Sequence, residues 1–448
     1  MSDGTPAAPG ILERLSLHRR ELRAWAMYDW AISAVQTTVM AAVFPIFYIQ
    51  VAGADVGATK ANQWWAISNG LAIAIVAVLS PILGAIADLA AAKKKLLALT
   101  TAIGVLGCAG MFFIEPGALT FASMLFVVVT IGAAAAVVFY DSLLPHIASP
   151  SEVDRVSAAA FAIGYLGGGL LLAVNLAMIQ KPAWFGLRET GGSLPVRLSM
   201  VTVALWWLIF SIPLFRRVPE PPRRLEQDEQ AGQSAVRVAF GRLLETFHEL
   251  RSFKHAFLML VAFLIYNDGI STIQKMATAY GTELGIRRES LIAAILIVQF
   301  VGVPATFLFG ALARWIGAKR SILAGLVIYL VVSVVAYSMK DAADFYLLAG
   351  LVGLVQGGTQ ALSRSLFATL IPRHKSGEFF GFYSVFSKFA GIFGPLVFAA
   401  IIGATGSSRN AILSVSAFFL VGGILLTFVN VEEGARRARA AEATTHEG

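Results

Sequence analysis

The sequence predicts an all-α membrane protein with twelve transmembrane helices, arranged as two pseudo-symmetric six-helix bundles. Three observations support this fold class: an apolar composition, a series of apolar runs of membrane-spanning length, and an internal repeat. Of the 448 residues, 57% are hydrophobic and 14% are charged, and the mean hydropathy is +0.73. Soluble domains carry about a quarter charged residues, so this composition indicates an integral membrane protein.

Apolar runs of about 20 residues recur along the chain, with short polar segments between them. In lipid only helices and closed barrels satisfy the backbone, and these runs are continuous rather than alternating, which predicts helices. The expected spans are 24–50, 64–88, 95–114, 119–142, 156–180, 196–215, 256–281, 288–313, 321–339, 343–371, 379–402 and 410–430.

These spans divide the chain into five parts. A short N-terminal segment at 1–23 precedes a first six-helix bundle at 24–215, and a polar linker at 216–255 leads to a second bundle at 256–431 and a tail at 432–448. Lysine and arginine are roughly three times as frequent on the side of the N-terminus as on the other side. This bias predicts a multi-pass protein of the cell membrane, with both termini and the linker in the cytoplasm.

The linker changes character along its length. Its first part is rich in proline, glutamine and charge, which is typical of a flexible connection. In its second part, from Val236 to Arg251, apolar and charged residues alternate at helical spacing. This pattern fits either an amphipathic helix on the membrane surface or an extension of the next membrane helix.

The two halves share a repeat. The stretch YDWAISAVQ from Tyr28 aligns without a gap on YNDGISTIQ from Tyr266, and each falls in the first helix of its half. A second pair, GAIADLAAAKKK from Gly84 and GALARWIGAKR from Gly310, follows the second helix of each half. Two halves related by duplication, in parallel orientation, are typical of transporters that work by alternating access.

Polar side chains inside the apolar spans are candidates for substrate binding, proton coupling or gating, because a charge at the bilayer centre is unfavourable by about 2.5 to 3.5 kcal/mol. Such side chains should face protein or water. The candidates are Asp29, Gln36, Asn267, Asp268, Gln274, Lys275, Gln360, Arg364 and Lys388.

Several of these candidates allow two interpretations. Asp29 is either a proton or amine site, or a structural carboxylate bonded near the interface, and Asp268 either exchanges protons or forms a gating ion pair with Lys275. Arg364 lies near the predicted cytoplasmic end of its helix, which favours a structural role at an inner gate, whereas Lys388 fits a deep cavity position. Two cations and two carboxylates together would suit a zwitterion such as an amino acid.

Twelve helices in two sets of six, with a basic loop after the second helix of each half, resemble the major facilitator superfamily. Within it, AWAMYDWAISA, FLIYNDGISTIQKMA, GLVQGGTQALSRSLFATLIP and GEFFGFYSVFSKFAGIFGPLVF resemble the autophagy-related vacuole effluxer family and its bacterial relatives. The resemblance covers nearly the whole chain apart from the first 20 residues, the linker and the tail.

The superfamily's loop motif is also recognisable. Gly84, Asp88 and the basic run from Lys93 to Lys95 match it, although Ala91 and Ala92 stand where glycine and a basic residue are usual. The second copy keeps the glycine at Gly310 and the basic residues that follow, but Arg314 takes the place of the aspartate. The resemblance therefore implies gating by a charge–helix contact in the first half more clearly than in the second.

The resemblance implies a secondary active transporter of a small polar solute, with amino acids as candidate substrates and protons as the candidate coupling ion. The expected partners are the solute, protons and membrane lipid, with no nucleic acid, no cofactor and no metal, and the expected state is a monomer. A receptor or scaffold that kept this fold and lost transport is the alternative. An enzyme is not expected, because no nucleophile, metal cluster or paired acid motif occurs at the predicted interfaces.

Overall fold

A computed structural model describes residues 10–187, 193–222, 224–225, 248–284, 286, 288–443 and 446–447. Within these residues, twelve helical segments are long and apolar enough to cross a membrane. Apart from one antiparallel pair of two-residue strands, β1 (Arg224–Leu225) and β2 (His446–Glu447), the regular structure described is helical. The predicted fold class is confirmed.

The N-terminal half begins with a short helix, α1 (Ile11–Arg14), and a first membrane helix that changes its winding along its length. This first helix consists of α2 (Arg20–Ala34), η1 (Val35–Ala42), α3 (Phe44–Phe47) and η2 (Tyr48–Ala52). The remaining elements of the half are α4 (Ala58–Leu89), α5 (Lys93–Gly110), η3 (Met111–Phe113), α6 (Leu119–Ile147), α7 (Val153–Gln180), η4 (Pro182–Phe185) and α8 (Leu194–Arg217).

The C-terminal half repeats the six-helix plan, with interruptions in its last two membrane helices. Its first four helices are α10 (Lys254–Glu283), α11 (Arg288–Ile316), α12 (Ala318–Ser338) and α13 (Ala342–Leu370). The eleventh and twelfth spans and their flanks are η5 (Arg373–Lys375), α14 (Ser376–Phe389), α15 (Phe393–Thr405), α16 (Ser408–Ser414), α17 (Ser416–Thr427) and α18 (Val431–Ala443).

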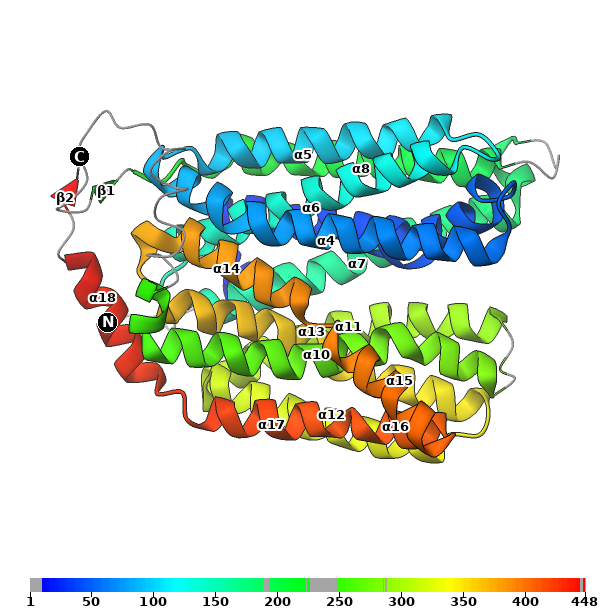
Figure 1. Cartoon of the computed structure of the whole chain (residues 1–448). Coiled ribbons are helices and arrows are strands. Elements are labelled where there is room, and N and C mark those ends of the chain that lie inside the picture. The colour runs from blue at the N-terminus through cyan, green and yellow to red at the C-terminus, as the bar shows by residue number, and fades with distance from the viewer. Residues whose placement is uncertain are drawn as a thin grey trace, which may run out of the picture.

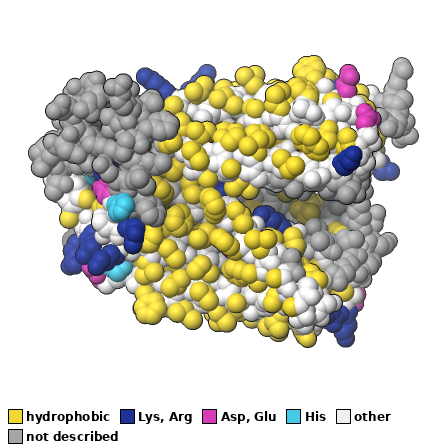
Figure 2. Space-filling model, viewed as in Figure 1, with side chains coloured by type: hydrophobic (Ala, Val, Ile, Leu, Met, Phe, Trp, Pro, Cys, Tyr) yellow, Lys and Arg dark blue, Asp and Glu magenta, His cyan; other side chains and the backbone are white. Residues whose placement is uncertain are grey.

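The two halves lie side by side with their helices running along a common direction (Figure 1). The described ends of the chain, α18 and the strand pair gather at one end of the molecule, on the left of Figure 1, which we call the termini end. On the face shown in Figure 2, hydrophobic side chains cover most of the surface between the two ends, as expected for a surface in contact with lipid.

Small residues let the halves approach closely at the termini end. In the contact between α4 and α14, a Cβ added at Gly84 would lie 2.1 Å from the carbonyl oxygen of Gly377, and one added at Gly381 would lie 2.6 Å from that of Ser80. Farther from this end, a Cβ at Gly70 of α4 would meet nothing within 4 Å. The two helices are therefore pressed together at the termini end, whereas the Cβ position of Gly70 faces open space.

The contact between α7 and α11 extends farther along the molecule. A Cβ at Gly310 would lie 2.7 Å from the Cβ of Ala158 near the termini end, and one at Gly169 would lie 3.3 Å from the Cβ of Gln299. Gly169 is more than halfway along α7 from the termini end. The halves are thus joined along α7 and α11 from the termini end as far as Gly169.

The first and eleventh helices depart from regular α-helical winding. In the first, π-type turns include a bond from the Val43 N–H to the Thr38 carbonyl at 2.9 Å. The eleventh is interrupted at residues 390–392, which we call the helix-11 break, where Gly391 has a φ of +95°. Such irregularities in membrane helices occur where the freed backbone groups find partners in the protein or line a wet cavity.

The predicted amphipathic helix of the linker lies mostly outside the described residues. Residues 248–252 are helical, and a bend at Phe253 separates them from α10. The tail, for which the sequence predicted no helix, contains α18, which packs on α10 and α13. A Cβ at Gly434 of α18 would lie 2.4 Å from the side chain of Leu370.

Candidate functional site

Arg364 of α13 extends from the C-terminal half into the N-terminal half and binds two carboxylates there. One terminal nitrogen lies 3.1 Å from Asp29 Oδ2 and the other 3.1 Å from Asp141 Oδ1. Its Nε donates to Ser157 Oγ at 3.0 Å, and Ser157 Oγ donates to the Ala361 carbonyl at 2.7 Å. We call Asp29, Asp141, Ser157 and Arg364 the Arg364 centre.

Aromatic rings enclose this centre. The guanidinium carbon of Arg364 lies 4.8 Å from the ring centroid of Trp25, 5.5 Å from that of Tyr140 and 4.4 Å from that of Phe161. The Tyr140 hydroxyl donates to Asp29 Oδ2 at 2.9 Å. A guanidinium suits this place because it donates several hydrogen bonds in one plane and stacks on aromatic faces.

The Arg364 centre includes two residues that the sequence analysis missed, Asp141 and Ser157. Asp141 lies in an apolar run and follows a tyrosine, as Asp29 does, so the Tyr–Asp pair was the signal that could have found it. Asp141 falls at the edge of the expected span 119–142 and therefore did not count as a residue inside the membrane, whereas the helix continues to Ile147. Asp141 and Arg364 each lie six residues before the ends of their helices, at equivalent positions of the two halves.

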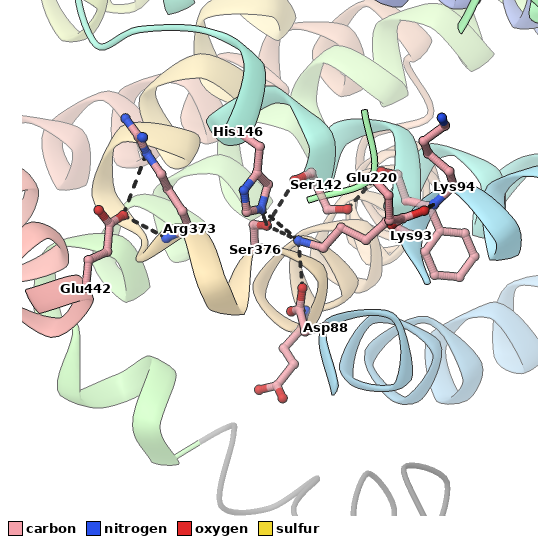
Figure 3. A network of polar contacts seen from close by, with 11 residues as sticks. Asp88, Lys93, Lys94, Ser142, His146, Glu220, Arg373, Ser376 and Glu442 are labelled. Atoms are coloured by element: carbon pink, nitrogen blue, oxygen red, sulfur yellow. Dashed lines mark hydrogen bonds and ion pairs between the residues drawn. The ribbon is translucent and has the colours of Figure 1, made fainter. Parts of the chain in front are cut away.

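A second polar contact joins the halves nearer the termini end (Figure 3). Asp88, in the last turn of α4, accepts a hydrogen bond from the backbone N–H of Glu378 at 2.9 Å and lies 2.7 Å from Lys93 Nζ. Lys93 Nζ also donates to Ser376 Oγ at 2.6 Å and to His146 Nε2 at 2.9 Å. We call Asp88, Lys93 and Ser376 the latch.

The latch places a carboxylate at the first turn of α14, where free N–H groups and the helix dipole stabilise negative charge. Behind it, the Glu220 carboxylate accepts the Lys94 N–H at 3.0 and 3.2 Å (Figure 3). Partial burial raises the pKa of Glu220 above its ordinary value, against the lowering effect of these backbone hydrogen bonds. The first copy of the loop motif therefore makes the charge–helix contact that the resemblance implied.

The second copy of the motif is built differently. Gly310 provides the close approach of α11 to Ala158 of α7, but Arg314 is exposed and has no ion pair among the described residues. Lys319 donates to the carbonyls of Thr427 and Val429 instead. Within the described residues, a motif carboxylate therefore contacts a helix N-terminus only in the first copy.

Asp268 and Lys275 meet the two sides of the helix-11 break. Asp268 is buried, with one oxygen accepting the N–H of Gly391 and the other the N–H of Gly394 at 3.0 Å. Lys275 Nζ donates to the Gly391 carbonyl at 2.9 Å. The carboxylate lies at the start of α15 and the ammonium at the end of α14, so each charge has the sign that the adjacent helix dipole favours.

The other candidates make few polar contacts. Lys388 is partly exposed near the end of α14 and has no hydrogen-bond or ion-pair partner among the described residues. Gln36 and Gln274, equivalent positions of the repeat, are both exposed, and Gln360 is half-buried. Asn267 is buried, and its Oδ1 has no partner within the described part of the chain.

The structure does not bring the four predicted charges together at one place. Asp29 is bound to Arg364, whereas Asp268, Lys275 and Lys388 gather at the helix-11 break. The Arg364 centre lies roughly 10 Å from the termini end of its helices, and Lys388 lies roughly 18 Å from the start of α14. The molecule therefore has two charged layers at different depths.

Between the halves, the surface is hollowed at the end away from the termini end, and Lys or Arg side chains are visible inside this hollow (Figure 2). Its closed end is occupied by the contacts of α4 with α14, by the latch and by the Arg364 centre. Among the described residues no group of His, Cys, Asp and Glu side chains is suited to hold a metal ion.

Comparisons with known proteins agree with this arrangement. The family model described as vacuole effluxer Atg22 like matches residues 59–439. The uncharacterised MFS-type transporter YxiO of Bacillus subtilis (strain 168) is 36% identical over 420 residues, covering 92% of this chain and 95% of that protein. Autophagy-related protein 22 of Yarrowia lipolytica is 28% identical over 317 residues, covering 64% of this chain and 52% of that protein, so the chain spans about half the length of this fungal relative.

Solved structures share the fold. The human organic anion transporter MFSD10 superposes with a TM-score of 0.69 at 15% identity, over 91% of this chain and 99% of that chain. The proton:xylose symporter XylE superposes with a TM-score of 0.69 at 13% identity, over 92% and 95%. The chain therefore belongs to the vacuole effluxer Atg22-like family of the major facilitator superfamily, and it is a membrane transporter rather than an enzyme.

Proposed function

We propose that this transporter moves a small polar solute by alternating access, with an amino acid as the candidate substrate and protons as the coupling ion. The observation that carries the proposal is a hollow between two six-helix halves that is open at one end and closed at the other by contacts between the halves. Rocking the halves about this hollow would expose it to the two sides of the membrane in turn. The description of the matched family as effluxers supports a solute leaving the compartment that contains it.

We place the protein in the cell membrane as a monomer surrounded by lipid, with the termini end in the cytoplasm. The excess of lysine and arginine on the N-terminal side supports this orientation. In it, the hollow faces the outside and the latch closes the cytoplasmic side.

The gate is assigned to the residues that join the halves at the termini end. Gly84 and Gly310 allow the helices to touch, and Asp88, Lys93 and Arg364 connect the halves by polar contacts. Arg314, which has the place of the motif aspartate in the second copy, is exposed and is assigned to the gate only by its position in the motif.

Proton coupling is assigned to the Arg364 centre. Opening the termini end requires Arg364 to leave the N-terminal half, because α13 belongs to the other half. Asp29 and Asp141 would then remain near each other without their shared cation. Two neighbouring carboxylates disfavour double ionisation, so one of them would take up a proton from the newly opened side. Asp268 is less suited to this role, because backbone N–H groups bind both of its oxygens.

The test is transport by the purified full-length protein in liposomes. Each of the twenty common amino acids would be offered in radiolabelled form in counterflow, followed by uptake driven by an imposed pH gradient. We expect at least one amino acid to exchange, and the pH gradient to drive its accumulation.

Replacing Asp141→Asn should abolish accumulation driven by the pH gradient but retain counterflow, because exchange requires no net proton movement. The control is Glu249→Gln, which removes a carboxylate bound to Lys375 outside the Arg364 centre. Loss of counterflow for every amino acid would contradict the substrate class, and a pH-driven response that survives in Asp141→Asn would contradict the coupling site.

A further inference from the structure

Three charged side chains meet at the helix-11 break: Asp268, Lys275 and Lys388. Gly391 contacts both Asp268, through its N–H, and Lys275, through its carbonyl, and Lys388 lies two residues before the break. Their formal charges leave one positive charge without a negative partner, in a helical layer where an uncompensated charge is unfavourable.

The Asp268 carboxylate is not free to pair with the second lysine or to bind a ligand. Its two oxygens are bound to the N–H groups of Gly391 and Gly394, and the residue is 1% exposed. It acts as the cap of α15, replacing the intrahelical partners that the first N–H groups of a helix lack. Both of its oxygens are therefore occupied by backbone hydrogen bonds.

The hydrogen-bond donors of Lys275 are only partly occupied. Its ammonium has three N–H donors, and the described residues supply one acceptor, the Gly391 carbonyl. The side chain is exposed. Two of its N–H donors therefore remain available to a solute group that enters the hollow between the halves.

Lys388 has no acceptor among the described residues. Its place in the last turn of α14 is favourable for a cation, since the helix dipole is equivalent to about half a negative charge there. Lys275 bonds to the Gly391 carbonyl, one residue beyond the C-cap of the same helix. The partial negative charge of the helix end is therefore too small to compensate the two positive charges of Lys275 and Lys388, which repel each other.

From this arrangement we propose that Lys275 and Lys388 form an anion-binding subsite at the helix-11 break, which takes the carboxylate group of the transported solute. The proposal rests on the hollow being the solute pathway of the proposed function, and it names the part of the solute that is recognised there. One carboxylate matches the single excess positive charge.

The same contacts correct the expectation of a zwitterion held between two lysines and two aspartates. Asp29 is bound to Arg364 in another layer, and Asp268 is a helix cap. The structure thus has a place for the carboxylate of an amino acid, whereas neither predicted aspartate is available for its ammonium group.

The test measures the local potential with a single cysteine and two reagents of opposite charge. Ser271→Cys is a conservative reporter, because Ser271 is partly exposed and its Cβ would lie 3.0 Å from a Cβ built on Gly391, beside Lys275 Nζ. The one native cysteine, Cys108, is buried and would be replaced by alanine. The probes are 2-sulfonatoethyl methanethiosulfonate and 2-(trimethylammonio)ethyl methanethiosulfonate.

We expect the anionic reagent to react faster than the cationic one by at least about tenfold, relative to their ratio with 2-mercaptoethanol, as one unit charge a few Å away would produce. Lys388→Gln should lower this ratio several-fold, and Lys388→Arg should retain it. Lys340→Gln, an exposed lysine in the loop before α13, should leave the ratio unchanged.

Competition identifies the anion. Sodium propionate should slow the anionic reagent more than sodium chloride at matched ionic strength, and propionamide should not slow it. Slowing by phosphatidylglycerol nanodiscs relative to phosphatidylcholine nanodiscs, without an effect of propionate, would assign the site to a lipid headgroup and overturn the proposal.

Three further outcomes would also overturn it: no preference for the anionic reagent, a preference that Lys388→Gln leaves unchanged, or no reaction of the Ser271→Cys protein with either reagent. None of these measurements requires transport. A protein that exchanges no amino acid but shows the charge-dependent ratio would refute the substrate class while leaving the subsite intact.

Discussion

Arg364 carries a full positive charge into the interface between the halves, where only 3% of the residue is exposed. The charge is tolerated because two carboxylates, a serine and three aromatic rings replace the water that it has lost. Breaking a buried ion pair by removing one partner destabilises a protein by about 3 to 5 kcal/mol. Separation of the halves at this point therefore needs a compensating event, such as entry of water or uptake of a proton.

At the residue scale, Ala91 is a position of backbone strain. Its φ of +46° is in the left-handed region, where the family motif usually has glycine. Glycine at this position should remove about 1 to 2 kcal/mol of backbone strain from the folded state. This gain should exceed the roughly 0.4 to 1 kcal/mol of stability that is lost because glycine gives the unfolded chain more conformational freedom. We expect Ala91→Gly to raise the thermal unfolding temperature of the detergent-purified protein. Ala90→Gly, at a residue with a φ of −90°, should lower it.

A second residue-scale prediction concerns pH and the docking of α18. Asn430 N–H donates to His255 Nδ1 at 3.2 Å, and His255 Nε2 forms a hydrogen bond with Glu433 Oε2 at 3.1 Å. This hydrogen bond lowers the pKa of Glu433 below its ordinary value of 4.5. A depressed carboxylate pKa contributes stability that is complete above pH 4.5 and is lost as the pH falls through the lower folded value.

Hydrogen exchange of the first turn of α18, corrected for the intrinsic rate, should therefore increase in acid below pH 4.5. In Glu433→Gln this acid-dependent increase should be absent. Equal pH dependence in the two proteins would show that Glu433 does not hold the helix.

The sequence identified most charged positions but not their partners. Asp29, Asp268, Lys275, Arg364 and Lys388 stand out, because ionisable residues in apolar runs are rare. Which charges meet depends on contacts between helices hundreds of positions apart, such as Asp29 with Arg364, and no local pattern encodes these. Asp141 was missed for a simpler reason, since it lies close to an uncertain helix boundary.

At the element scale, the helix-11 break depends on one glycine, Gly391. Gly391 has a φ of +95°, and a Cβ there would lie 2.8 Å from Lys275 Nζ and 3.0 Å from the Cβ of Ser271. Glycine therefore permits both the left-handed backbone and the approach of α10. Asp268 then caps the helix that restarts beyond the break.

We expect Gly391→Ala to lower the unfolding temperature and to reduce transport, because the strain and the contact both oppose the break. The matched control is Gly403→Ala in α15, where a Cβ would meet nothing within 4 Å. It should be neutral or stabilising by up to about 1 kcal/mol, since alanine is the better helix former. Similar losses in both variants would contradict a special role for Gly391.

Helix existence was predictable and helix interruption was not. Twelve apolar stretches of sufficient length define the spans, and membrane helices satisfy their own backbone. The expected span 379–402 contains Gly391 and Gly394, but glycine is also common in uninterrupted membrane helices. Only the approach of Asp268 and Lys275 from another helix makes the break favourable.

At the scale of the whole molecule, the two ends differ in how the halves meet. The termini end is joined by glycine contacts, the latch and the Arg364 centre, and the opposite end is hollowed. A transporter that alternates must have these two arrangements at similar free energy. Small changes at the closed end should therefore shift the population of conformations.

Gly84→Ala tests this balance. The added methyl would collide with the Gly377 backbone and should push the termini end apart, whereas Gly70→Ala, on the same helix with nothing within 4 Å, should not. Spin labels at Lys95→Cys and Arg436→Cys, both exposed near the termini end, would report the distance between the halves in a Cys108→Ala background. A longer distance distribution is expected for Gly84→Ala alone, and an unchanged one would argue against the glycine contact as a gate.

The internal repeat made the two-bundle architecture predictable, because duplicated halves with six helices each pack in parallel orientation. The repeat could not indicate which end is closed. Its two copies have diverged at the residues that decide this, with Asp88 forming the latch in one half and Arg314 remaining unpaired in the other, as far as the described residues extend.

Both described chain ends emerge at the termini end, since the twelve candidate crossings found in the described residues return the polypeptide to the face on which it started. A fluorescent protein fused before α1 or after α18 would consequently sit in the same compartment, and either fusion would report on orientation. The loop between α12 and α13 emerges on the opposite face, so an epitope tag inserted there would be reached by antibody only from across the bilayer.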